Sequence, residues 1–329
     1  MKTALCDRLG IEVPIVLAPM AGGHSPQLAA AVSNAGGLGT LPLWGASLDA
    51  LRRQVRETQA LTSRPFAVNL NLNFPQEDRL AACLDEGVKV ISFFWQEPGV
   101  PLARATAAGA IVMHSVGNAE AARQAVDCGA DVIVAQGWEA GGHVRGTVAT
   151  MALVPAVVDA VGAVPVVAAG GIADGRGLAA ALALGAAGAW IGTRFLASTE
   201  AAIHPVYQQR LLAATENDTV WLENLFDVSW PDAPHRVLRN STIANWEAAG
   251  RPPPGKRPGE GEVIATSPTR GDIVRYRSYT VGPDTSGDLE ALSLWAGQGV
   301  GIVRKVQPAA DIVSEITAEA AAILQRLGA

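Results

Sequence analysis

Residues 164–177 read VPVVAAGGIADGRG, and residues 185–198 read GAAGAWIGTRFLAS. Each stretch starts with a short apolar run, which is typical of a buried parallel strand. Each run passes directly into small residues, namely Gly170 and Gly171 in the first stretch and Gly192 and Thr193 in the second. Because glycine leaves backbone amides accessible, such turns can bind an anion, and the start of a following helix would add its positive dipole end. A (β/α)8 barrel binds phosphate after its seventh and eighth strands, so the two turns predict this fold and a phosphorylated ligand.

The same pattern repeats from residue 12 to about residue 200, as a short apolar run, turn residues and an Ala-rich helical stretch. Eight runs are predicted strands, at residues 15–18, 37–41, 66–69, 88–92, 110–113, 132–135, 164–168 and 188–191. Helices are expected at residues 25–35, 48–61, 76–86, 101–108, 119–128, 153–161 and 177–184. This alternation implies parallel pairing, and eight repeats favour a closed barrel over an open sheet. No GxGxxG motif follows the first strand, which argues against a dinucleotide-binding Rossmann domain.

The repeat ends near residue 200. Residues 203 to about 250 look helical, with Trp221, Trp230 and Trp246 as large apolar anchors, and residues 251–261 (RPPPGKRPGEG) have the composition of a mobile loop. We therefore expect three parts, which are an α/β barrel at residues 1–202, a small, mainly helical lid at residues 203–300, and a C-terminal segment and helix at residues 301–329 that pack back on the barrel. The lid would cover the face where a barrel enzyme has its active site.

Composition limits the partners and the compartment. The chain has 329 residues, of which 49% are hydrophobic and 17% charged, and a formal net charge of −6. The negative charge argues against nucleic acid and acidic membranes as partners. Three widely spaced cysteines without CxxC spacing and five histidines without metal-binding spacing predict neither disulfides nor a metal site. Neither a signal sequence nor a membrane-spanning stretch is recognised, so we expect a cytoplasmic protein.

The sixth predicted strand ends in AQGWEAGGHVRG, at the expected catalytic face. His143 follows Gly141 and Gly142, so its ring can project from a tight loop. An imidazole titrates near neutral pH, which suits a general base or acid. The alternative is a loop histidine that is hydrogen-bonded to a neighbour, but the glycines and the place in the barrel favour the first interpretation. Glu139 could pair with His143 or, equally, with Arg145.

The first predicted strand ends in LAPMAGGHS. Pro19, Met20 and Ala21 would form a compact, mostly apolar ledge whose backbone could face a planar ring system. Ser25 and Pro26 also have the pattern of a helix N-cap and first helical residue, and both interpretations can hold together.

Two further strands end in polar residues. The third ends in AVNLNLN, where Asn69 offers a donor and an acceptor to a heterocycle, whereas Asn71 and Asn73 look like turn residues. The fifth ends in VMHS, which places His114 and Ser115 at the same face. A GxSxG motif is absent from the sequence, which argues against acyl transfer.

Together these motifs resemble the nitronate monooxygenase family, formerly called 2-nitropropane dioxygenases, whose members are FMN-dependent barrel enzymes. The matching segments are LAPMAGG, AVSNAGGLGTL, RPFAVNLNL, AQGWEAGGH, AAGGIADGRGLAAALALGA, GTRFLAS and WAGQGVGIV. They spread from residue 16 to about residue 303, with the weakest match between residues 204 and 290. As a set they are more specific for the barrel than for its substrate.

The resemblance implies FMN as the cofactor and His143 as the catalytic base. The cofactor-binding residues that it implies are Gly170, Gly171, Gly192 and Thr193 at the phosphate; Pro19, Met20 and Ala21 behind the isoalloxazine; Asn69 and Gln136 at its polar edge or the ribityl chain; Gly141 and Gly142 in the loop before the base; and Gln298 from the C-terminal segment. His114 stands where some relatives have lysine or glutamine near the N1–C2 edge of the flavin.

The implied reaction oxidises an alkyl nitronate, or a nitroalkane whose α-proton His143 removes, with dioxygen to a carbonyl compound and nitrite. The alternative is an NAD(P)H-dependent reductase on the same scaffold, because the motifs also resemble FMN-dependent enoyl-[acyl-carrier-protein] reductases and NADH:quinone reductases. A phosphosugar isomerase or aldolase would need a lysine at a strand end, and the predicted strands do not end in one. We expect a small-molecule substrate and a monomer or homodimer.

Overall fold

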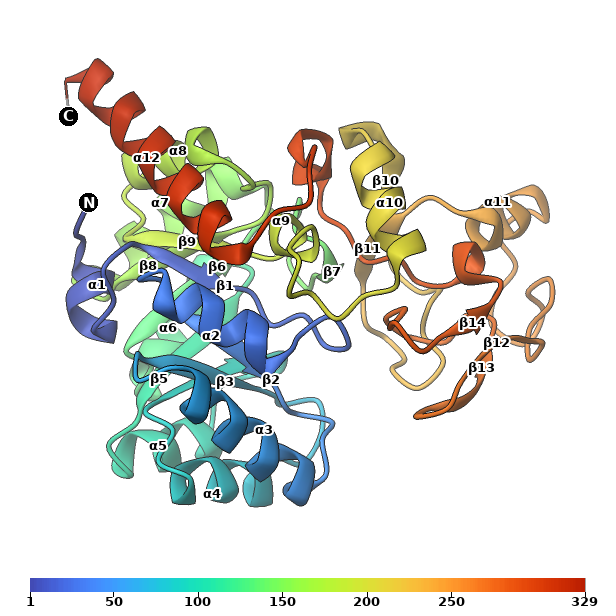
Figure 1. The fold of residues 1–329 in the computed structure, drawn as a ribbon, viewed down its shortest axis with the longest axis horizontal. Helices are drawn as coiled ribbons and strands as arrows, with labels where there is room; N and C mark the ends of the chain where they lie inside the picture. The colour runs from blue at the N-terminus through green and yellow to red at the C-terminus, as the bar shows by residue number, and fades with distance from the viewer. Residues whose placement is uncertain (329) are drawn as a thin grey trace.

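The computed structural model describes residues 1–328 and contains a barrel of eight parallel strands surrounded by helices (Figure 1). The strands are β1 (Ile15–Leu17), β2 (Gly39–Pro42), β3 (Phe66–Asn71), β4 (Val90–Phe94), β5 (Ile111–Val116), β6 (Val132–Gln136), β8 (Val166–Ala169) and β9 (Gly188–Ile191). Their spatial order is β1-β9-β8-β6-β5-β4-β3-β2. A parallel bridge between Val16 and Leu38 joins the two ends of this sheet. The predicted (β/α)8 barrel is therefore confirmed.

Helices cover the outside of the barrel between successive strands. They are α2 (Pro26–Asn34), α3 (Leu48–Leu61), α4 (Glu77–Asp85), α5 (Val100–Ala107), α6 (Ala119–Asp127), α7 (Thr150–Val161), α8 (Gly175–Ala183) and α9 (Thr193–Leu196). Ser25 is the N-cap of α2, since its hydroxyl accepts a hydrogen bond from Leu28 N at 2.9 Å. A further helix, α1 (Ala4–Leu9), buries Leu5 and Leu9 among the side chains that fill the barrel interior.

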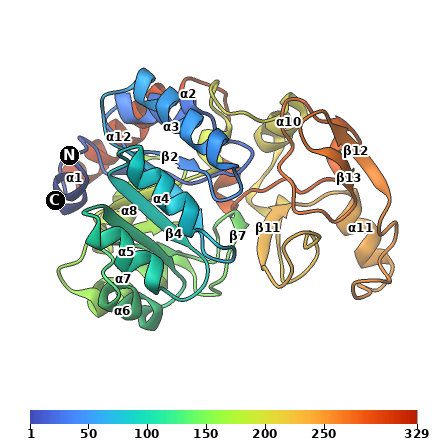
Figure 2. The same cartoon turned by 90° about the horizontal axis from the view of Figure 1, so that it is seen from below.

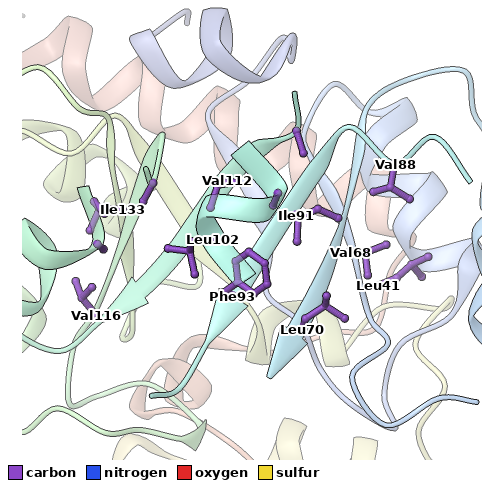
Figure 3. Packing of buried hydrophobic residues seen from close by; sticks show 14 of the residues in the cluster. Leu41, Val68, Leu70, Val88, Ile91, Phe93, Leu102, Val112, Val116 and Ile133 are labelled. Atoms are coloured by element: carbon purple, nitrogen blue, oxygen red, sulfur yellow. The ribbon is translucent and has the colours of Figure 1, made fainter. Parts of the chain in front are cut away.

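Side chains of the strands alternate between the barrel interior and the helical layer, because a strand has a two-residue period. Val90 of β4 and Met113 of β5 belong to the interior cluster. Ile91, Phe93 and Val112 on the same two strands pack outward in the cluster beneath the helices (Figure 3). The same alternation decides which residues at the strand ends face the inside of the barrel.

Residues 203–300 lie beside the barrel and combine helices with short antiparallel strands (Figures 1 and 2). The elements are α10 (Pro205–Ala213), β10 (Thr219–Leu222), β11 (His235–Leu238), α11 (Ser241–Ala248), β12 (Val263–Ser267), β13 (Gly271–Val274) and β14 (Ser286–Gly287). The segment is mixed rather than mainly helical as expected. The run TVWL in β10 is rich in β-branched and aromatic residues, and it pairs antiparallel with HRVL in β11.

The barrel and this segment share a sheet. The loop after β6 contains a short strand, β7 (Gly142–His143), which pairs antiparallel with β11, so that His143 lies opposite His235. Figure 2 shows β7 and β11 at the junction of the two parts. The segment 203–300 therefore helps to fix the position of the histidine that the sequence singles out.

The Pro-rich stretch 251–261 is anchored, although its composition predicts a mobile loop. Arg257 is buried, and its two terminal guanidinium nitrogens donate to the carboxylate of Asp227 at 2.7 and 2.6 Å. Tyr276 OH donates to Pro258 O at 2.7 Å. The composition of the stretch gives no sign of these hydrogen bonds, because their partners, Asp227 and Tyr276, lie outside it.

The C-terminal helix α12 (Ala309–Leu327) packs against α8 and α2 in the helical layer of the barrel (Figure 1). Its buried face includes Ile312 and Ile316, and Glu319 accepts a hydrogen bond from Gly175 N at 2.7 Å. None of the helices within residues 1–328 has the length and apolar content needed to cross a bilayer.

Candidate functional site

The two glycine-rich turns after β8 and β9 present free backbone amides. Gly170 and Gly171 have φ angles of 106° and 73°, a left-handed region that favours glycine. Within residues 1–328, the amides of Gly170, Gly171, Gly192 and Thr193 are not paired with a carbonyl or side-chain acceptor. A Cβ atom on Gly192 would lie 3.3 Å from Ala18 Cβ and 3.8 Å from Met20 Sδ, so this turn adjoins the predicted ledge after β1. Unpaired amides beside such a ledge fit the phosphate end of a flavin nucleotide.

The N-terminus of α8 does not add further amides to this site, contrary to expectation. The carboxylate of Asp174 accepts hydrogen bonds from Arg176 N and Gly177 N at 3.0 and 3.2 Å. The carboxylate of Glu319 on α12 accepts from Gly175 N. The first amides of α8 are therefore already paired with two carboxylates, whereas the four amides of the turns have no acceptor within residues 1–328.

His143 is held at the junction of the barrel loop and β11. Its carbonyl accepts a hydrogen bond from Gln136 Nε2 at 3.1 Å, and Val144 N donates to Pro234 O at 2.8 Å. Nε2 of the imidazole is buried and has no hydrogen-bond partner within the described chain. Burial, and in second place the nearby ring of His235, lower the pKa of His143 well below its ordinary 6.5. The imidazole is therefore neutral near pH 7 and can accept a proton.

Glu139 pairs with neither of its two expected partners. Its carboxylate accepts hydrogen bonds from Thr150 N and Oγ1 at 2.8 and 2.9 Å. Thr150 Oγ1 also lies 3.1 Å from Gly170 O, so these contacts tie the loop after β6 to the turn after β8. Arg145 pairs instead with Glu97 at 3.3 Å. The expected pairs of Glu139 with His143 or with Arg145 are therefore wrong.

The segment WAGQG at residues 295–299 reaches the same region from the far end of the chain. A Cβ on Gly141 would lie 2.3 Å from Gly297 N, so the two backbones cross where only glycine fits. Gly297 N donates to Thr193 Oγ1 at 3.0 Å, and Gln298 N donates to Glu139 O at 3.0 Å. The segment 295–299 thus contacts both the loop after β6 and the turn after β9. The side chain of Gln298 is half-buried beside them.

The register of β5 places His114 on the side of the sheet that faces the helices. His114 pairs in register with Phe93 and Ile133, which both face the helical layer. The next residue, Ser115, pairs with Val134 of the barrel interior and is half-buried. The two-residue period of β5 therefore turns His114 away from the site and gives the inner position to Ser115.

Asn69 and Asn71 both face the barrel interior at the end of β3. Asn69 is buried and donates from Nδ2 to Ser92 Oγ at 2.9 Å. Asn71 also closes the turn that follows, as predicted, because its Oδ1 accepts from Asn73 N at 3.0 Å. Its Nδ2, however, is buried without a partner within residues 1–328. Asn71 is thus a candidate ligand-binding residue, whereas the sequence predicts only a turn role for it.

A cluster of aromatic rings surrounds the imidazole of His143. The ring centroids of Trp230, Trp295 and Trp95 lie 3.8, 5.0 and 6.0 Å from it. The sequence marks Trp230 only as an apolar anchor, because its proximity to His143 depends on long-range pairing of β7 with β11. This cluster is the main part of the site that sequence analysis misses.

The buried histidines make stability depend on pH. Burial lowers the pKa of His114 and of His235 to about 4, so between pH 6.5 and 4 the unfolded chain binds protons that the folded chain does not. We expect the free energy of unfolding to fall by about 3 kcal/mol for each of them as the pH drops through this window. Urea unfolding of His114→Leu should show a slope lower by about 1.4 kcal/mol per pH unit between pH 6 and 5. His204→Asn, at a half-buried helix cap, is the control, and an unchanged slope in His114→Leu would contradict the assignment.

Comparisons with known proteins point to one family. A family profile described as nitronate monooxygenase matches residues 2–79 and 74–319. A nitronate monooxygenase of Paraburkholderia phytofirmans is 33% identical over 375 residues, which cover 99% of this chain and 97% of that protein. A (3aS,4S,5R,7aS)-5-hydroxy-7a-methyl-1-oxo-octahydro-1H-indene-4-carboxyl-CoA dehydrogenase of Mycobacterium tuberculosis is 40% identical over 254 residues, covering 76% of this chain and 70% of that protein. The solved structure of FabK from Thermotoga maritima superposes with a TM-score of 0.86 at 35% identity, covering 99% of this chain and 98% of that one.

Proposed function

The chain belongs to the nitronate monooxygenase family, and on this basis we propose that it oxidises alkyl nitronates or nitroalkanes with dioxygen, using FMN, to a carbonyl compound and nitrite. The observation that carries the proposal is the buried Nε2 of His143, which has no partner within residues 1–328. Burial also lowers the pKa of this imidazole, which favours its neutral form. It lies on the loop after β6, and the same loop contacts the turns with unpaired amides.

The free amides of Gly170, Gly171, Gly192 and Thr193 would hold the phosphate of FMN, because they are donors without partners in the described chain. Pro19, Met20 and Ala21 would support the ring system, and Asn69, Asn71 and Gln136 would offer polar groups to it. Gly141 and Gly142, on the loop after β6, and Gln298, on the segment that crosses this loop, would lie beside the cofactor. FMN, when bound, supplies the redox chemistry. The residues 203–300 would act as the lid over this face.

His143 would act on neutral nitroalkanes as the base. Its Nε2 would accept the α-proton, while the electron pair of the broken C–H bond moves into the nitro group to give the nitronate. The side-chain amide of Gln136 donates a hydrogen bond to the backbone carbonyl of His143. This contact would hold the backbone of His143 in place and so help to orient its ring. A preformed nitronate has already lost this proton, so the enzyme would need His143 less for it.

The second candidate is a dehydrogenase or reductase that exchanges electrons with NAD(P)H. It is favoured by the 40% identity to the indene-4-carboxyl-CoA dehydrogenase of Mycobacterium tuberculosis and by the similarity to the FabK structure. The same histidine and the same anion-binding turns would serve this reaction, so site geometry alone does not separate the two candidates.

Anaerobic reduction separates them. Protein loaded with FMN should be bleached rapidly by propyl nitronate and only slowly by NADH or NADPH. Consumption of dioxygen with release of nitrite should accompany turnover in air. Rapid bleaching by a nicotinamide and none by the nitronate would support the second candidate. Protein that neither contains flavin nor takes up FMN would overturn both.

A further inference from the structure

Trp230 lies against the imidazole of His143. Their ring centroids are 3.8 Å apart, with an interplanar angle of 26°, which is a stacked arrangement. Three further rings from loops of the barrel pack around Trp230 at tilted or edge angles, with centroid distances of 5.3 Å to Trp95, 5.7 Å to Trp44 and 5.8 Å to Phe74. Trp230 thus connects the loops after β2, β3 and β4 with the proposed base.

The turn that carries Trp230 is braced by His235. Nδ1 of His235 lies 2.8 Å from Ala233 O, and its Nε2 accepts a hydrogen bond from Phe226 N at 3.3 Å. Both ring nitrogens are therefore occupied within the turn. Because Nε2 accepts, Nδ1 carries the proton and donates it to the carbonyl.

The turn also holds two residues in an unfavourable conformation. Ser229 and Asp232, on either side of Trp230, have φ angles of 79° and 52°. Residues other than glycine rarely adopt such angles, and they persist where the surrounding structure requires them. Here the surrounding structure places the indole of Trp230, which is 4% exposed, over the imidazole of His143.

Taking the proposed role of His143 as a base, we propose that Trp230 is its positioning residue, which stacks on the imidazole to fix the ring plane and to exclude water from it. Stacking restricts rotation of the ring, so that Nε2 stays in one direction. Exclusion of water makes the charged imidazolium unfavourable, which is consistent with the lowered pKa of His143.

Among the charged and titratable neighbours, only His235 contributes to the lowered pKa of His143, and it does so in second place after burial. The two rings face each other from β7 and β11. From the Trp230 turn the carboxylate of Asp227 is paired with Arg257, and Glu223 and Asp232 are exposed. From the loop after β4 comes Glu97, which is exposed and paired with Arg145. The stretch from Ser293 to Gly299 contributes no charged residue.

Two variants test the proposal, together with a matched control. Trp230→Met stays apolar but is smaller than tryptophan and has no flat ring, so that water can reach the imidazole, whereas Trp230→Phe retains a ring that can stack. Trp246→Phe changes a tryptophan of α11 that does not contact His143. Each protein is examined by NMR titration of ¹⁵N-labelled histidine and by the pH profile of kcat/KM for a neutral nitroalkane, with preformed nitronate as a second substrate.

In the wild-type protein we expect His143 to titrate well below its ordinary pKa of 6.5. In Trp230→Met its pKa should rise by at least one unit and kcat/KM for the nitroalkane should fall 10- to 30-fold, with a smaller change for the nitronate. Trp230→Phe should recover most of both values, and Trp246→Phe should resemble the wild type. The proposal is overturned if a folded Trp230→Met leaves the His143 titration unchanged, or if the wild-type His143 titrates near 6.5.

The two readouts separate this inference from the proposed function. The NMR titration needs no turnover, so it tests the positioning by Trp230 even if the protein does not act on nitroalkanes. Failure of the proposed function would instead appear as absent turnover in the wild type with the titration behaving as expected. If Trp230→Met does not fold, the titration of His143 in Trp230→Phe takes its place, and a wild-type His143 that titrates near 6.5 still overturns the proposal.

Discussion

His143→Asn is expected to lower kcat/KM for a neutral nitroalkane about 10³-fold while FMN remains bound. A positioned general base contributes roughly 10²- to 10⁴-fold, and in this site Nε2 of His143 is the buried acceptor that is left unpaired on the loop after β6. Asparagine is similar in size but cannot take up a proton at neutral pH. Turnover is measured as nitrite release, and bound FMN by absorbance after gel filtration.

Two comparisons make this result specific. Turnover of preformed nitronate should fall by a much smaller factor, because its α-proton is already gone. His204→Asn should behave as the wild type, since asparagine can also cap α10 and residue 204 lies away from the loop after β6. If His143→Asn processed nitroalkane at the wild-type rate, the assignment of His143 as the base would be wrong. The family assignment would not be affected.

The barrel could be predicted because buried parallel strands leave a simple trace in sequence. Short apolar runs bounded by glycine mark β8 and β9, and the other six strands follow the same pattern. The ends of β3 and β5 were predicted too early, because their apolar runs stop at Asn69 and Met113. The backbone ladder continues through Asn71 and Val116, since hydrogen bonding between strands does not depend on side-chain polarity.

The candidate site was predictable where it depends on the local chain. The turn at Gly170 and Gly171 needs backbone angles that glycine favours, so its sequence reveals it. Two features were not predictable in this way. The direction of His114 follows from the two-residue period of β5 only once the strand is known to continue past Met113, and the stack of Trp230 on His143 depends on β7 pairing with β11, 92 residues further along the chain. Composition and local periodicity carry no signal for such pairings.

Gly192→Val is expected to weaken FMN binding by at least 100-fold without unfolding the barrel. Gly192 follows β9 directly and is the N-cap of α9. A Cβ there already meets Ala18 Cβ at 3.3 Å and Met20 Sδ at 3.8 Å, so the two further methyl groups of valine would crowd the turn and displace a phosphate from its amides. Loss of two hydrogen bonds to a charged phosphate, at about 1.5 kcal/mol or more each, corresponds to roughly 100-fold in Kd.

The measurement is titration of the flavin-free proteins with FMN, followed by fluorescence quenching, alongside circular dichroism and thermal unfolding. Gly192→Ala should give an intermediate loss, because one methyl group fits with a small shift of Ala18. Gly45→Val is the matched control, since Gly45 is exposed and a Cβ there has no heavy atom within 4 Å in the described chain. If Gly192→Val folded and bound FMN with unchanged affinity, the phosphate could not lie at this turn. The free amides of Gly192 and Thr193 would then need another ligand, and the proposed use of FMN would lose its structural support.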